Sequence, residues 1–213
     1  MARSAPKLIL ASASPRRREI LEAAGFDFEI VPASIAEQAH EGESPEEFVC
    51  RIAQEKARAC WRQLPQPGRH PVLAADTVVV VEERVLGKPA SAEQARWMLQ
   101  MLSGKEHRVL TGLCLVYLLP QGPASATEPT VDVRVASTAV KFSKLTESEI
   151  QEYLASGEPL DKAGAYAIQG RASKYVEWIQ GCFFNVVGLP VSLLYRMLKE
   201  ANLMPEERRG ISP

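Results

Sequence analysis

The sequence contains few of the residues that build metal or disulfide frameworks. Only four cysteines and three histidines occur in 213 residues. No two cysteines form a C-x-x-C pair, and no histidine lies near a cysteine at the spacing of zinc ligands. These absences argue against a structural zinc site and, more strongly, against a secreted disulfide scaffold. We expect four reduced thiols that are buried among apolar neighbours.

The sequence also lacks an excess of charge and a long apolar run. Its 25 Lys and Arg residues nearly balance 26 Asp and Glu residues, which gives a net charge of −1. This balance provides no general attraction to nucleic acid or to an anionic membrane, so we expect neither as a partner. No apolar stretch approaches the ~20 residues that a membrane-spanning helix needs. We therefore expect a cytoplasmic protein in which any basic site is local.

The composition is that of an ordinary globular protein. Hydrophobic residues make up 46% of the chain and charged residues 24%, as in domains with a packed core. The length lies within the range of single α/β domains. Because no repeat or low-complexity tract divides the chain, we expect one domain over residues 1–204, followed by a short polar tail at 205–213.

Periodicity and capping signals predict an alternation of strands and helices. Strands are expected at 7–11, 26–31, 72–81, 85–86, 108–119 and 131–135, and helices at 15–24, 45–64, 91–103, 146–156 and from 190 onward. Segments 175–179 and 185–187 are expected to form a late hairpin, and 120–129 an exposed loop. Since adjacent strands are joined by tight turns, the pattern predicts an α/β fold with a mixed sheet.

The first segment that could carry chemistry is S-A-S-P-R-R-R at 12–18, between a strand and a helix. Free amides and the helix dipole make such a helix start a site for anions. Helical spacing turns Arg16 and Arg17 inward, beside Ser12 and Ser14. One interpretation is a solvated basic face. The inward arginines favour the other, a site for a polyanion such as a phosphate chain.

Asp76 interrupts the apolar run at 72–81. Burying an unpaired carboxylate costs several kcal/mol, so this side chain needs a metal, a cation or a proton. One interpretation is a structural aspartate that accepts hydrogen bonds from backbone amides at a strand bulge. The alternative is a metal ligand or general base at a strand end that faces a cleft.

Other candidates are individually weaker. Lys56 falls on the apolar stripe of its helix, where a lysine alone is more often a snorkelling side chain than a functional one. Lys88 is weaker still in isolation. The glycine-rich segment 157–170 allows close backbone approach, and its Asp161 and Lys162 offer a handle for a metal or phosphate.

These segments together contain several cations, at least two carboxylates and no convincing nucleophile. The sequence has no Walker loop and no G-x-G-x-x-G, G-x-S-x-G or H-E-x-x-H motif. The combination fits metal-assisted attack of water on a phosphoanhydride, in which catalysis is mostly positioning and charge neutralisation.

Eight motifs in order along the chain resemble the Maf family. They are L-A-S-A-S-P-R-R at 10–17, Q-E-K-A at 54–57, A-D-T-V at 75–78, G-K-P at 87–89, L-S-G at 102–104, T-G at 111–112, S-G-E-P-L-D-K-A-G at 156–164 and N-V-V-G-L-P at 185–190. The resemblance extends from about Leu8 to Asn202. It implies an elongated mixed β-sheet flanked by helices around a central cleft, as in the inosine triphosphatases. It also implies a nucleoside triphosphate pyrophosphatase that depends on Mg²⁺ (or Mn²⁺) and often dimerises.

The resemblance implies a role for each matching residue. Asp76 would accept a proton from water, and Glu37 would be a metal-associated acid. The metal set would then be Glu37, Asp76 and Asp161. Substrate-binding residues would be Ser12, Ser14, Arg16, Arg17, Lys56, Thr77, Lys88, Lys162 and Gln169. Among these, Arg16, Thr77 and Gln169 match the subgroup that acts on dTTP and UTP.

The sequence departs from the family pattern at a few positions. Ala36 stands where a second acid commonly precedes Glu37, Ala167 replaces a glycine, and C-F-F at 182–184 replaces a smaller polar stretch. The family is also linked to septum formation, so the alternative hypothesis is a nucleotide-binding regulator of cell division without obligatory turnover. A buried base at Asp76 favours the enzyme.

Overall fold

The computed structural model, which describes residues 7–119 and 128–204, has the expected mixed α/β architecture. Its seven-stranded sheet has the order β2-β1-β3-β5-β6-β7, with β4 paired to β3. The strands are β1 (Leu8–Leu10), β2 (Phe28–Ile30), β3 (Val72–Val81), β4 (Arg84–Leu86), β5 (Glu106–Tyr117), β6 (Thr130–Phe142) and β7 (Val176–Gln180). β1 is parallel to β2 and β3, and the other pairs are antiparallel. The predicted tail at 205–213 and most of the predicted loop at 120–129 lie outside the described residues.

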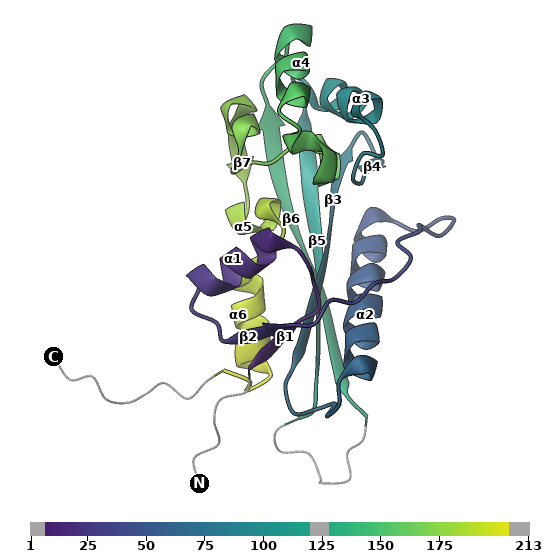
Figure 1. The fold of residues 1–213 in the computed structure, drawn as a ribbon, viewed down its shortest axis with the longest axis vertical. Coiled ribbons are helices and arrows are strands. Elements are labelled where there is room, and N and C mark those ends of the chain that lie inside the picture. The colour runs from purple at the N-terminus through teal and green to yellow at the C-terminus, as the bar shows by residue number, and fades with distance from the viewer. Residues whose placement is uncertain (1–6, 120–127, 205–213) are drawn as a thin grey trace, which may run out of the picture.

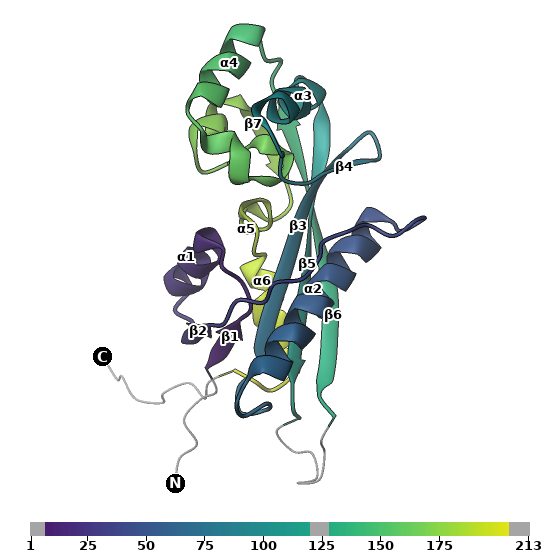
Figure 2. The ribbon, with the colours of Figure 1, turned by 45° about the vertical axis from the view of Figure 1, so that its right-hand side comes forward.

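The long strands β3, β5 and β6 define the long axis of the molecule (Figure 1). The helices are α1 (Pro15–Ala23), α2 (Pro45–Gln63), α3 (Ala92–Leu102), α4 (Glu147–Ala155), α5 (Phe183–Val187) and α6 (Val191–Glu200). α2 lies along one face of the sheet, α1, α5 and α6 lie on the other, and α3 and α4 lie together at one end (Figure 2). None of the helices in these two ranges is long and apolar enough for a membrane span.

Capping residues mark where several helices begin. Ser44 and Glu47 form a reciprocal capping box at the start of α2, and Thr146 and Glu149 form another at the start of α4, as the sequence predicts. Ser14 is the N-cap of α1, but its side chain makes no capping hydrogen bond. Its backbone N–H donates to Ser12 Oγ at 3.2 Å instead.

Two expectations are wrong. Residues 185–187 belong to the short helix α5 and do not pair with β7, which pairs with β6. The buried Asn185 side chain explains the difference, because it donates to Val109 O at 2.9 Å and to Thr138 Oγ1 at 3.0 Å and so anchors a helical turn. All four cysteines are free, but only Cys60 and Cys114 are buried, whereas Cys50 and Cys182 are half-buried.

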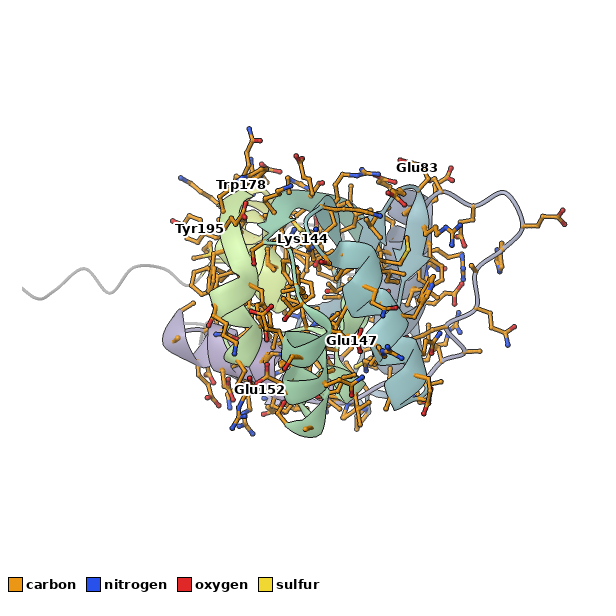
Figure 3. The ribbon with its side chains drawn as sticks, turned by 90° about the horizontal axis from the view of Figure 1, so that it is seen from above. Glu83, Lys144, Glu147, Glu152, Trp178 and Tyr195 are labelled. Atoms are coloured by element: carbon orange, nitrogen blue, oxygen red, sulfur yellow. The ribbon has the colours of Figure 1, made fainter. Side chains whose placement is uncertain are left out.

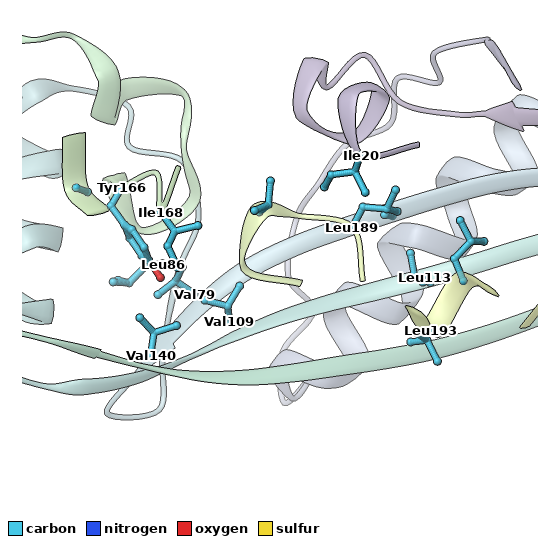
Figure 4. Packing of buried hydrophobic residues seen from close by; sticks show 14 of the residues in the cluster. Ile20, Val79, Leu86, Val109, Leu113, Val140, Tyr166, Ile168, Leu189 and Leu193 are labelled. Carbon is cyan, nitrogen blue, oxygen red and sulfur yellow. The ribbon is translucent and has the colours of Figure 1, made fainter. Parts of the chain in front are cut away.

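The alternation of side chains along β3 divides the core between the two faces of the sheet. Leu73, Ala75, Val79 and Val81 pack into the main core with residues of α1, α3 and α6, part of which is seen in Figure 4. The intervening valines and alanines pack towards α2. Consecutive side chains of β3 therefore face different helices.

Charged side chains lie on the end of the molecule formed by α3 and α4 (Figure 3). Seen from above, Lys144, Glu147 and Glu152 lie on this end, and Trp178 and Tyr195 lie on a flank (Figure 3). Glu147 accepts from Arg96 Nε at 2.7 Å, which joins α4 to α3 by a surface ion pair.

Candidate functional site

Asp76 and Thr77 occupy the middle of β3, where the alternation points them to opposite faces. Asp76 is 7% exposed and Thr77 is half-buried. The pairing of β3 with β5 continues without a shift through Asp76, which lies opposite Gly112. A strand bulge therefore does not account for the buried carboxylate, and its partner must come from another element.

That partner is Lys56 of α2. Its Nζ lies 2.7 Å from Asp76 Oδ1 and 2.6 Å from Glu37 Oε1. The Lys56 side chain is 11% exposed and ends on two carboxylates, so the snorkelling interpretation is wrong. One ammonium thus links a buried carboxylate of the sheet to a half-exposed carboxylate of the loop that precedes α2.

Gly112 allows α2 to lie this close to the sheet. A Cβ atom at Gly112 would lie 2.3 Å from the backbone oxygen of Val49 in α2. Any larger residue would push α2 outward at the strand position opposite Asp76 and would lengthen the contact between Asp76 and Lys56. The T-G motif at 111–112 therefore has a packing role that the sequence does not reveal.

Arg17 of α1 is held by three oxygen acceptors. Its Nε donates to Gly188 O at 2.9 Å, Nη1 to Ser12 Oγ at 3.1 Å and Nη2 to Thr77 Oγ1 at 3.2 Å. Burial lowers the pKa of Arg17, and the nearby charge of Asp76 opposes this shift. A guanidinium has five N–H donors, so two remain available to a ligand.

The pKa of Asp76 is raised by burial, although the charge and hydrogen bond of Lys56 and the charge of Arg17 act in the opposite direction. The carboxylate therefore has a higher affinity for a proton than an exposed aspartate, although it is paired with the Lys56 ammonium. A general base needs this combination, because it must be ionised at rest and must still accept a proton from water.

The remaining cationic candidates come from loops. Lys162 Nζ contacts Asp161 Oδ1 and lies 3.4 Å from Glu158 O. Partial burial raises the pKa of Asp161, but the hydrogen bond and charge of Lys162 and the charge of Arg16 lower it. The pKa of Asp161 is therefore below its usual value.

Tight packing fixes the loop that carries Lys162 against the sheet. Gly164 has φ +67°, and a Cβ atom there would lie 2.8 Å from Val79 Cγ2. Its N–H donates to Gly87 O at 3.0 Å, so the loop of Lys88 and the loop of Lys162 lie side by side. Lys88 and Gln169 are themselves exposed.

The structure brings together some of the predicted residues more closely than others. Ser12, Arg17 and Thr77 are in direct contact, as are Glu37, Lys56 and Asp76. It is Arg17 and not Arg16 that contacts Thr77. Ser14 is half-buried beside Ser12, with which its backbone forms a hydrogen bond.

The carboxylates suit a divalent cation only in part. Within residues 7–119 and 128–204, no three His, Cys, Asp or Glu side chains gather as a metal-binding group. Asp161 therefore does not join Glu37 and Asp76. Mg²⁺ is commonly held by one or two carboxylates together with substrate phosphates. Glu37 and Asp76, which contact the same ammonium, fit that requirement as a pair.

Two surface hollows lie outside this cluster. One of about 490 Å³ is lined by residues between His40 and Gln54, including Arg51, which is paired with Glu43 at 2.6 Å. The other, of about 330 Å³, is lined by residues of α4 and of the 3₁₀ turn Arg171–Tyr175. Both are open surface depressions, and the paired cluster around Asp76 is the better candidate because its polar groups are buried and converge.

Two further residues complete the cluster, although no local sequence pattern gives them a role. Thr111, which is fully buried, lies 2.9 Å from Thr77 through the two hydroxyl oxygens. Gly188 supplies the carbonyl that accepts from Arg17. Both lie in motifs of the resemblance, which was the only signal available, since their contacts depend on strand register and on the turn after α5.

The structure is an α/β protein with a mixed sheet and a buried ion pair on β3, beside which an arginine keeps free N–H donors. The family model described as Maf-like protein matches residues 7–201, and the chain belongs to this family.

Similar proteins from bacteria match almost the whole chain. The dTTP/UTP pyrophosphatase of Geobacillus sp. (strain WCH70) is 49% identical over 193 residues, which cover 91% of this chain and 97% of that protein. The dTTP/UTP pyrophosphatase of Anaeromyxobacter dehalogenans (strain 2CP-1 / ATCC BAA-258) is 48% identical over 205 residues, with coverages of 96% and 99%. The structure of the Staphylococcus aureus Ham1 protein is similar with a TM-score of 0.48 and 14% identity, covering 91% of this chain and 98% of that one.

Proposed function

We propose that this protein is a nucleoside triphosphate pyrophosphatase that hydrolyses dTTP and UTP to the monophosphate and pyrophosphate, a house-cleaning reaction. The observation that carries the proposal is the buried Asp76 paired with Lys56, with Glu37 on the same ammonium. The names of the 46–49% identical relatives support the same reaction.

In this proposal Asp76 accepts a proton from the attacking water. The water oxygen bonds to the α-phosphorus while the bond from that phosphorus to the bridging α–β oxygen breaks, and pyrophosphate leaves. Arg17 directs its two remaining N–H donors at the phosphates, and Lys56, Lys88, Lys162 and Arg16 add positive charge. Glu37 and Asp76 would hold Mg²⁺ or Mn²⁺, which when bound would polarise the phosphate and activate water.

The test is product identification. Purified protein is incubated with Mg²⁺ and, separately, UTP, dTTP, CTP, ATP and GTP, and the phosphate products are separated. Monophosphate with pyrophosphate is expected, with UTP and dTTP hydrolysed fastest. Orthophosphate with diphosphate would refute the proposed cleavage position, and tight binding without turnover would favour a nucleotide-binding regulator.

Base selection is proposed for Thr77 and Gln169, together with Arg16. The Gln169 amide both donates and accepts, which matches the carbonyls and N–H of uracil and thymine. A carboxylate at this position only accepts. The Gln169→Glu variant is therefore expected to lose up to about 10⁴-fold in kcat/KM for UTP and dTTP while its melting temperature stays unchanged. Parallel Arg16→Ala and Arg17→Ala variants would show which arginine acts with Thr77.

We also propose that the protein acts in the cytoplasm as a homodimer. Four free thiols are compatible with a reducing compartment. Sedimentation equilibrium measures the dimer directly, and a monomer at micromolar concentration would refute it.

A further inference from the structure

A buried chain of hydroxyl groups lies behind the candidate base-selecting residue Thr77. Thr77 on β3 faces Thr111 on β5 as a direct cross-strand pair, and their hydroxyl oxygens are 2.9 Å apart. Thr111 has no exposed surface, and its Oγ1 donates to Asn185 O at 3.3 Å. Arg17 Nη2 donates to Thr77 Oγ1 from the opposite side at 3.2 Å.

The ends of this chain determine the direction of every hydrogen bond in it. A carbonyl oxygen only accepts and a guanidinium only donates, whereas each hydroxyl has a single proton. The Thr111 hydroxyl donates its only proton to Asn185 O. Thr77 must therefore donate its own proton to Thr111, and its oxygen accepts from Arg17. Hydrogen bonds that run in one direction along such a chain strengthen one another.

The acceptor at the end of the chain is firmly held. The Asn185 side chain is fully buried and donates to Val109 O at 2.9 Å and to Thr138 Oγ1 at 3.0 Å. Thr138 in turn donates to Cys182 O at 3.2 Å. These contacts fix α5 against β5 and β6, so the carbonyl of Asn185 stays in place behind Thr111.

We propose that Thr111 is a specificity-positioning residue, which takes the proton of Thr77 and leaves the Thr77 oxygen facing the ligand only as an acceptor. The proposal rests on the pyrophosphatase function proposed above. An acceptor at Thr77 favours a base that presents an N–H group, as uracil and thymine do at N3. It disfavours cytosine, whose N3 is itself an acceptor, because two acceptors would then face each other.

The test replaces the Thr111 hydroxyl without changing the side-chain shape. In Thr111→Val the Thr77 proton loses its partner and becomes free to point at the ligand. The ratio of kcat/KM for UTP to that for CTP is expected to fall about tenfold or more, mostly through KM, with kcat for UTP within about threefold of wild type. Calorimetric binding of α,β-imido analogues of UTP and CTP should show the same change in the ratio of Kd values.

The matched variant Thr111→Ser separates the loss of the hydroxyl from a change in packing, because it keeps the hydroxyl and removes only a methyl group. It is expected to retain the wild-type ratio. If Thr111→Val does not fold, Thr111→Cys offers a weaker donor and acceptor of similar size, and an intermediate ratio is expected.

An unchanged ratio in a folded Thr111→Val protein would overturn the proposal, and so would an equal shift in Thr111→Ser. Wild-type protein that releases no pyrophosphate from UTP would refute the proposed function instead. In that case the binding ratios of the imido analogues still decide the role of Thr111.

Discussion

The residues of the candidate site fall into two groups that the chain holds in different ways. The sheet group consists of Arg17, Lys56, Asp76 and Thr77, which are buried or half-buried and form two contacts, one between Arg17 and Thr77 and the other between Lys56 and Asp76. The loop group consists of Lys88, Asp161, Lys162 and Gln169. In it the Asp161 side chain is 74% exposed, and Lys88 and Gln169 are exposed as well. The Lys162 side chain is 15% exposed, but its ammonium ends on the exposed Asp161.

This difference has an energetic meaning. Charges that are buried before the ligand arrives have already lost their hydration, so the sheet group is positioned in advance at a cost to the stability of the fold. Exposed loop charges cost the fold little and become ordered when a ligand neutralises them. Substitutions in the sheet group should therefore change both turnover and stability, whereas substitutions in the loop group should change substrate affinity alone.

The largest effect is expected at Asp76. Asp76→Asn keeps the shape of the side chain but removes the charge that accepts a proton and contributes to metal binding. Removal of a general base typically lowers the rate by about 10²–10⁴-fold. The steady-state rate of pyrophosphate release measures this loss, and circular dichroism checks the fold. Near-normal turnover would mean that another group is the base, and Glu37 would then be replaced next.

The next largest effect concerns the stability of the sheet group. Lys56→Met leaves Asp76 buried without its nearest cation, and breaking such a pair costs about 3–5 kcal/mol in the free energy of unfolding. Urea denaturation at pH 7 measures the cost. Burial already raises the pKa of Asp76. Protonation of Asp76 at lower pH should therefore reduce the stability difference between Lys56→Met and the wild type.

The matched control for Lys56 is Lys105, which lies 2.7 Å from Glu82 at the surface. Exposed pairs contribute about 0–1 kcal/mol, so Lys105→Met is expected to have little effect. Equal losses in the two variants would mean that buried and exposed ion pairs contribute alike to the stability of this protein.

Local signals in the sequence account for most of the fold. The apolar run at 72–81 predicts β3 with its observed bounds, and both capping boxes mark real helix starts. The apolar segment at 185–187 predicts a strand and is helical, since the buried amide of Asn185 binds Val109 and Thr138 from distant strands. A tertiary contact of this kind overrides local propensity.

The site was predictable to the extent that its residues are unusual in their local context. Asp76 stands out because a carboxylate interrupts an apolar run. Lys56 does not stand out, since a lysine on an apolar stripe is commonly a snorkelling side chain, and only the packing of α2 reveals its two carboxylate partners. The contacts of Thr111 depend on strand register, which no local pattern specifies.

A smaller loss of stability is expected at low pH, and its cause is the buried His107. Tyr166, within the loop, has its hydroxyl 2.9 Å from His107 Nε2, and burial lowers the pKa of His107 to about 4. An unfolded chain takes up this proton near pH 6.5, so the unfolded state binds more protons between pH 6.5 and 4. Stability is therefore complete above pH 6.5 and is lost as the pH falls towards 4.

The expected loss between pH 7 and pH 5 is about 2 kcal/mol, from about 1.4 kcal/mol for each pH unit below 6.5. Urea denaturation of wild type and of His107→Phe at both pH values isolates this contribution. The variant should lose less stability than wild type on acidification. Parallel losses in the two proteins would show that carboxylates and not His107 cause the sensitivity.

The smallest effect on stability is expected at Lys162. Its ammonium contacts Asp161, whose side chain is largely exposed, and exposed ion pairs add less than about 1 kcal/mol. Lys162→Ala should therefore leave the midpoint of urea denaturation nearly unchanged, but it should raise KM for UTP about tenfold by removing one phosphate contact. Lys174→Ala, which removes an exposed partner of Glu152 at 3.4 Å, serves as the control and should change neither quantity. If Lys162→Ala destabilised the protein as much as Lys56→Met, the loop group would be as firmly built into the fold as the sheet group, and the division between them would fail.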